Sequence, residues 1–140
     1  MPIKYVAVVA VFILLLQSCA QNKTTELSRT WKIQNLKYDK EIPPTLKPTV
    51  EQSIAQMRKS FTLTYNPNGT YHSDFDGQKL EGKWKLNWNS STITSTSNDG
   101  KTKAYQIKEL TDKSFVFEAE EGGEKVIFEM IPANNEKNTK

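Results

Sequence analysis

The 140-residue chain has very few of the side chains on which metal sites and nucleophilic catalysis depend. It contains one cysteine, Cys19, and one histidine, His72. A lone cysteine cannot form an intramolecular disulfide, and a zinc site needs about four cysteine or histidine ligands. The chain also has no glycine-rich phosphate loop and no local serine–histidine–aspartate signature. We therefore expect a fold that is stabilised by its apolar core, with no catalytic residues, no metal and no cofactor.

An excess of charge of one sign is also absent. The chain has 19 Lys and Arg against 16 Asp and Glu, a net charge of +3, and the two signs alternate along its length. Domains that bind nucleic acid usually carry a clustered basic excess. This balance predicts no nucleic-acid partner.

Long hydrophobic runs are limited to one, Tyr5–Leu16, which follows Lys4 and contains twelve residues. A transmembrane helix needs about 20 apolar residues, whereas the apolar core of a secretory signal needs roughly 7 to 15. Polar residues begin at once with Gln17, so the run cannot be extended. The length favours a cleaved secretory signal, and an uncleaved single-span anchor is the alternative.

The end of this run resembles the lipobox of bacterial lipoprotein signal peptides, with Leu16, the small Ser18 and Cys19 in order. The resemblance implies removal of residues 1–18 as a lipoprotein signal peptide. It also implies that Cys19 then carries diacylglycerol and an N-linked acyl chain such as palmitate. Several acyl chains anchor a protein stably, whereas one gives only marginal binding. The expected partner is thus the membrane, and Ala20 after the cysteine implies the outer membrane of the cell envelope.

The remaining 122 residues suit one domain. Residues 19–26 are polar and without period, and we interpret them as a flexible tether. Residues 133–140 are rich in Asn and Lys and are predicted to be a disordered tail. The folded domain is expected over residues 27–132.

Within that domain, apolar and polar residues alternate with period two, and turn residues recur about every ten positions, which is typical of an all-β meander or barrel. About eight strands are expected. Their inward positions are Trp31 and Ile33; Phe61, Leu63 and Tyr65; Tyr71, Ser73 and Phe75; Leu80, Gly82, Trp84, Leu86 and Trp88; Ile93; Tyr105 and Ile107; Phe115, Phe117 and Ala119; and Val126, Phe128 and Met130.

One segment breaks this period. Val50, Ile54 and Met57 recur at helical spacing between Thr49 and Lys59, and Pro48 precedes them. This pattern predicts a short helix between the first two strands, over one end of the sheet structure.

The chain resembles the small bacterial lipocalin-like lipoproteins. The resemblance rests on Leu27–Ile33, Asn68–Tyr71, Gly82–Leu86 and Tyr105–Leu110 followed by Phe115–Phe117, and it covers about residues 27–131. It implies a small up-and-down β-barrel that binds small apolar molecules. One position differs, because Arg29 stands where such chains usually carry glycine.

Whether such a barrel is hollow decides its function. If it is, Tyr71, Trp84, Tyr105 and Phe117 are the candidate ligand-binding residues, because aromatic rings line pockets and hydroxyl groups orient a ligand. The expected ligand is then a small hydrophobic or amphipathic molecule. If the rings fill the interior, the domain is a solid-core structural or protein-interaction module of the envelope.

Other polar clusters predict solvated surface. His72 alternates with the inward positions of its strand, so it should face solvent. Asp74 and Asp76 lack the further ligands of a calcium loop. The acidic residues around Gly122 and Gly123 are better explained as keeping a hairpin soluble than as a metal site.

Overall fold

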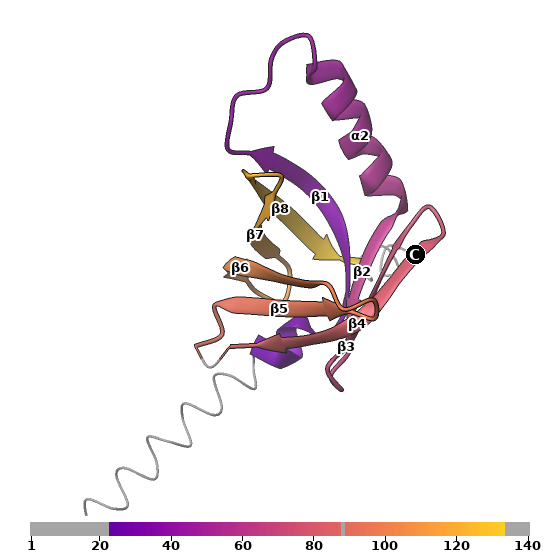
Figure 1. Ribbon diagram of the computed structural model, residues 1–140, viewed down its shortest axis with the longest axis vertical. Coiled ribbons are helices and arrows are strands. Elements are labelled where there is room, and N and C mark those ends of the chain that lie inside the picture. The colour runs from indigo at the N-terminus through magenta and orange to yellow at the C-terminus, as the bar shows by residue number, and fades with distance from the viewer. Residues whose placement is uncertain (1–22, 88, 134–140) are drawn as a thin grey trace, which may run out of the picture.

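The computed structural model describes residues 23–87 and 89–133. The predicted signal peptide, Cys19, Trp88 and residues 134–140 therefore lie outside the described residues. Eight antiparallel strands, each hydrogen-bonded to its neighbours in sequence, form a barrel that closes where β8 pairs with β1 (Figure 1). They are β1 (Thr30–Tyr38), β2 (Phe61–Tyr65), β3 (Thr70–Phe75), β4 (Gln78–Leu86), β5 (Thr92–Ser97), β6 (Thr102–Leu110), β7 (Phe115–Glu121) and β8 (Glu124–Pro132). The predicted eight-stranded up-and-down barrel is confirmed.

The alternation of apolar residues decides which face of each strand is inside. In β7, Phe115, Phe117 and Ala119 are buried, whereas Val116 and Glu118 between them are only partly so. Leu80 follows the same alternation in β4 but is 48% exposed. It lies near the β3–β4 turn, at an end of the barrel, where it keeps the inward phase of its strand but remains half exposed.

The helix between the first two strands is also confirmed, as α2 (Lys47–Ser60). Proline in its first turn suits a helix start, because the missing N–H has no helical partner there. Ile54 is buried, and Val50 and Met57 pack partly buried against the core. Arg58 Nε donates a hydrogen bond to the Gln34 carbonyl at 2.7 Å, which ties α2 to β1. In Figure 1, α2 stands beside β1 and β2.

Residues 23–27 form a short helix, although the sequence predicts a tether without regular structure over 19–26. Lys23 Nζ donates a hydrogen bond to the Leu110 carbonyl at 3.0 Å, and Leu27 is completely buried. These contacts hold the segment against one end of the barrel, at the side opposite α2 in the view of Figure 1. The described part of the predicted tether therefore belongs to the folded domain.

The described residues include no helix that is long and apolar enough to span a bilayer.

Candidate functional site

One end of the barrel is filled by its own side chains. Trp31 and Phe115 are completely buried, with ring centroids 5.3 Å apart, and the Trp31 Nε1–H donates to the Leu27 carbonyl at 3.0 Å. Tyr65 is nearly as buried and meets the edge of Trp84 at 5.1 Å. We call this packed half, which the residue 23–27 helix covers, the closed end.

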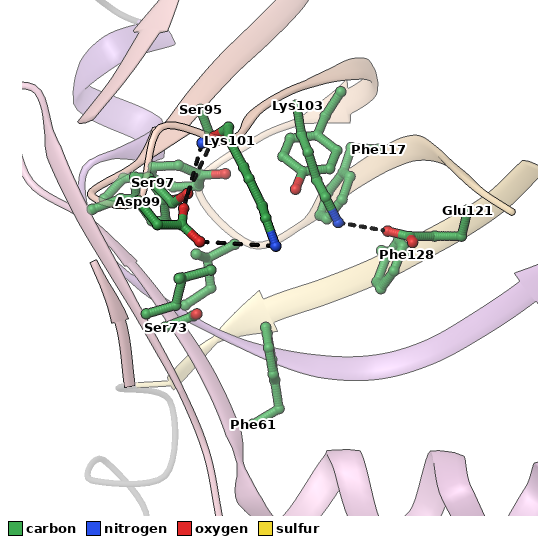
Figure 2. A pocket seen from close by; sticks show the side chains of 15 residues that line it. Phe61, Ser73, Ser95, Ser97, Asp99, Lys101, Lys103, Phe117, Glu121 and Phe128 are labelled. Carbon is green, nitrogen blue, oxygen red and sulfur yellow. Dashed lines mark hydrogen bonds and ion pairs between the residues drawn. The ribbon is translucent and has the colours of Figure 1, made fainter. Parts of the chain in front are cut away.

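The other half of the barrel is hollow. It contains a cavity of about 400 Å³, within the roughly 300–1,000 Å³ typical of small-molecule sites. Its walls come from seven strands, β2 to β8, and from the β5–β6 turn, and Figure 2 shows their side chains. The lining residues are Phe61, Leu63, Tyr65, Tyr71, Ser73, Leu80, Ser95, Ser97, Asp99, Lys101, Lys103, Tyr105, Phe117, Glu121 and Phe128. The interior is thus neither wholly solid nor wholly hollow.

Three of the four candidate ligand-binding residues meet at this cavity. Tyr71, Tyr105 and Phe117 line it, and the Tyr105 and Phe117 rings contact each other at 5.2 Å in an edge geometry. Trp84 is not among the lining residues. Its ring packs on Tyr65, and its Nε1–H donates to the Asn66 carbonyl at 3.0 Å. The expectation that Trp84 lines the cavity is therefore wrong, because its indole N–H has a backbone partner at the closed end.

Two ion pairs stand at the mouth of the cavity, which we call the rim. Lys101 Nζ lies 3.9 Å from Asp99 Oδ2, and Lys103 Nζ lies 3.2 Å from Glu121 Oε1 (Figure 2). Asp99 also accepts hydrogen bonds from the Ser97 hydroxyl and the Lys101 N–H, and the Ser97 hydroxyl is the main cause that lowers its pKa. Each basic side chain of the rim is therefore matched by a carboxylate.

Three tyrosine phenols share the cavity wall, and their environment keeps them neutral. Burial raises the pKa of Tyr105 to about 12, with smaller contributions from Tyr71 and Glu121. Burial also raises the pKa of Tyr65 far above its usual range, which a hydrogen bond from Ser95 offsets only in part. The pKa of Tyr71 is raised by burial and by the nearby charge of Asp99. At neutral pH all three side chains present an uncharged hydroxyl group.

The match to known families decides the assignment. Residues 27–117 match the lipocalin-like domain family. The chain belongs to this lipocalin-like family. No curated protein matches it.

Solved structures with some similarity to this lipocalin-like chain come from Bacteroides. A lipocalin-like protein from Bacteroides uniformis is 14% identical, with a TM-score of 0.47, over 74% of this chain and 96% of its own. A protein of the DUF4847 family from Bacteroides vulgatus is 12% identical, also with a TM-score of 0.47, over 75% of this chain and 92% of its own.

Sequence reasoning missed the polar part of this lipocalin-like cavity. Ser95 and Ser97 are the buried polar residues of the described chain, and Lys103 and Glu121 stand at the rim. A signal was present, because Ser95 and Ser97 continue the inward phase of Ile93, and Glu121 continues that of Phe117 and Ala119. The prediction of cavity residues considered aromatic side chains alone and therefore omitted these polar positions.

At the closed end, Arg29 stands where such chains usually carry glycine, and the barrel still closes. Its guanidinium Cζ lies 5.5 Å from the Trp31 ring centroid, and its Nη1 donates to the Asp112 carbonyl at 2.8 Å. A cation over an indole face is attractive, so Arg29 covers the closed end from outside.

The remaining polar candidates lie on the surface, as expected for solvated groups. His72 is exposed. Asp74 accepts a hydrogen bond from the Gly77 N–H, and Asp76 accepts from Gln56 Nε2. Glu118 lies 3.0 Å from Lys108 and 3.6 Å from Lys125. Among the described residues, no group of three or more histidine, cysteine, aspartate or glutamate side chains is arranged to hold a metal ion.

Proposed function

We propose that this chain is a lipid-anchored, lipocalin-like binding protein of the bacterial outer membrane that holds a small hydrophobic or amphipathic molecule in its barrel. The observation that carries the proposal is the aromatic cavity of about 400 Å³, which opens at one end of an otherwise closed barrel. A packed interior of this size would bury more apolar surface, so an unfilled half is a cost to stability that ligand binding explains.

The proposed role is binding rather than catalysis. The cavity residues are aromatic and aliphatic side chains with neutral hydroxyl groups, and the rim carboxylates are paired with lysines. General acid–base catalysis usually depends on a group whose pKa lies near the working pH. The shifted pKa values at this site move further from pH 7, since those of Tyr71 and Tyr105 rise and that of Asp99 falls.

The lipid anchor rests on the sequence. Cys19 stands only a few residues before Lys23, where the described fold begins. Replacing Cys19 with Ala should release the protein from membranes and abolish labelling by a fatty-acid probe. A Cys19→Ala protein that remained in the membrane fraction would support an uncleaved anchor instead.

The binding role is tested by native mass spectrometry of the domain expressed in a bacterial envelope, which should show an added small-molecule mass. Ser73→Trp places an indole in the cavity, whereas His72→Trp places one on the outer face of the same strand. We expect the added mass, and the uptake of a hydrophobic dye, to be lost only in Ser73→Trp. If the unmodified domain shows no added mass and takes up no dye, the binding proposal is contradicted and the protein-interaction module is favoured.

A further inference from the structure

The charges around the cavity are confined to its rim and are already paired. Asp99 with Lys101 and Lys103 with Glu121 account for every charged residue that lines the cavity. The wall inside the rim contains only aromatic, aliphatic and hydroxyl side chains. A charged group inside would meet no opposite charge, and an isolated buried charge costs several kcal/mol. This arrangement disfavours a ligand that carries charge into the cavity.

The wall nevertheless offers hydrogen bonds. Tyr71 and Tyr105 both line the cavity, and within the described part of the chain neither hydroxyl group has a protein hydrogen-bond partner. The two phenols are near enough for Tyr71 to influence the ionisation of Tyr105. A hydroxyl group that faces a cavity without a protein partner is free to bond to water or to a ligand.

Much of the remaining cavity wall is apolar, beginning with the Phe117 ring that contacts Tyr105. Phe117 and Phe128 stack at 4.8 Å with their planes 4° apart, and Phe61 also lines the cavity (Figure 2). Leu63 and the half-exposed Leu80 add apolar side chains from β2 and β4, the two strands that flank the strand of Tyr71. A ligand in the cavity therefore meets both hydrocarbon side chains and neutral hydroxyl groups.

We propose that the cavity selects an uncharged amphiphile, such as an alcohol, ketone or ester. Its oxygen hydrogen-bonds to the Tyr71 and Tyr105 hydroxyl groups, and its hydrocarbon part lies against Phe61, Phe117 and Phe128. The inference rests on the proposed binding function and adds the charge of the ligand and its orientation.

Three probes with the same hydrocarbon chain test the charge. Binding of 1-decanol, decanoate and decylammonium to the purified domain at pH 8 is measured by titration calorimetry. We expect 1-decanol to bind at least about tenfold more tightly than either charged probe, because only the neutral head group enters without a large desolvation cost.

Two matched variants test the orientation. Tyr105→Phe removes one hydroxyl group from the cavity wall, and Tyr38→Phe removes one from the end of β1, outside this cavity. The first should weaken 1-decanol binding by about 3- to 10-fold, the usual effect of one neutral hydrogen bond. The second should leave the affinity unchanged. Far-ultraviolet circular dichroism confirms that both variants fold.

Other outcomes separate this inference from the proposed function. If either charged probe binds as tightly as 1-decanol, or if Tyr105→Phe has no effect, the inference is overturned while the binding function stands. The inference also falls if no probe binds although a ligand copurifies from the envelope. If no probe binds and no added mass is seen, both fail together.

Discussion

Tyr71 lies directly opposite Gly82 across the β3–β4 ladder, and its ring occupies the space that a side chain at position 82 would need. A Cβ built on Gly82 would stand 2.8 Å from Tyr71 Cε1 and 2.1 Å from the Thr96 carbonyl oxygen. The glycine thus allows β4 and β5 to approach closely and allows a cavity tyrosine to lie against the sheet. An aromatic ring covering a strand glycine is a recognised device for stabilising such positions.

Gly82→Ala should therefore be strongly destabilising, because the contact with Thr96 is to backbone and cannot be relieved by a rotamer change. We expect a loss of about 2–3 kcal/mol in the free energy of unfolding, as for overpacked cores. Urea denaturation measures it, with the exposed neighbour Lys83→Ala as the control. Equal stabilities of the two variants would show that the strands separate without cost.

Trp31→Ala should weaken the closed end. It removes a fully buried indole, its 5.3 Å contact with Phe115 and its hydrogen bond to the Leu27 carbonyl. Replacing a buried tryptophan by alanine typically costs about 3–5 kcal/mol. The midpoint of urea unfolding should fall accordingly, whereas Lys85→Ala on the exposed face of β4 should leave it nearly unchanged. A small effect at Trp31 would mean that the residue 23–27 helix is not coupled to the barrel.

The raised tyrosine pKa predicts loss of stability in alkaline solution. The pKa of Tyr105 is about 12 in the folded chain against 10.0 for the free side chain, mainly because of burial. The unfolded chain therefore releases this proton first, and the stabilisation, complete below pH 10, is lost as pH rises toward 12. One such group changes the free energy of unfolding by at most ~1.4 kcal/mol per pH unit.

Urea unfolding of the wild type and Tyr105→Phe between pH 8 and pH 11.5 isolates this contribution. The wild type should lose more stability than the variant above pH 10, and their difference should be constant below it. Parallel curves over the whole range would exclude a raised pKa at Tyr105.

A lipid on Cys19 should orient the barrel on its membrane. Cys19 is four residues from Lys23, a span of at most about 14 Å, and Lys23 is bonded to Leu110 at the closed end. Because Cys19 is the single cysteine of the sequence and would be blocked by the lipid, Lys113→Cys and Asp76→Cys would each add one site for a fluorescent label. Lys113 lies in the β6–β7 turn at the closed end, and Asp76 in the β3–β4 turn beside α2.

Energy transfer from each label to acceptor lipids in a supporting vesicle measures its height above the bilayer. We expect stronger transfer from position 113 than from position 76. Equal transfer from the two labels would mean that the anchored barrel tumbles freely.

The strand pattern could be predicted from the sequence because each strand has one face in the interior and one in water. In β7, for example, Phe115, Phe117 and Ala119 are buried and alternate with the less buried Val116 and Glu118. The helix α2 was predictable for the same reason at helical spacing. The helix at 23–27 was not, because five residues are too few to show a period and its contacts with Leu110 and Trp31 are made across the fold.

The cavity was only partly predictable. Alternation places Tyr71, Trp84 and Tyr105 on inward faces, but it does not say at which end of the barrel each ring packs. Trp84 turns to Tyr65 and the Asn66 carbonyl, which fills the closed end, while Tyr71 and Tyr105 remain beside empty space. The volume of the cavity depends on how all of these inward side chains pack together. No single segment of the sequence predicts that packing.

The pairing of β8 with β1 also limits how this protein can meet other chains. Every strand of the barrel has a hydrogen-bonded neighbour on both sides, from the β1–β2 ladder round to the β8–β1 ladder. A partner that docks by adding a strand needs a row of unpaired N–H and C=O groups at a sheet edge. Along these paired ladders a protein partner would therefore have to recognise side chains on the barrel wall, the rim or α2, and self-association through the paired strands would first require a ladder to open.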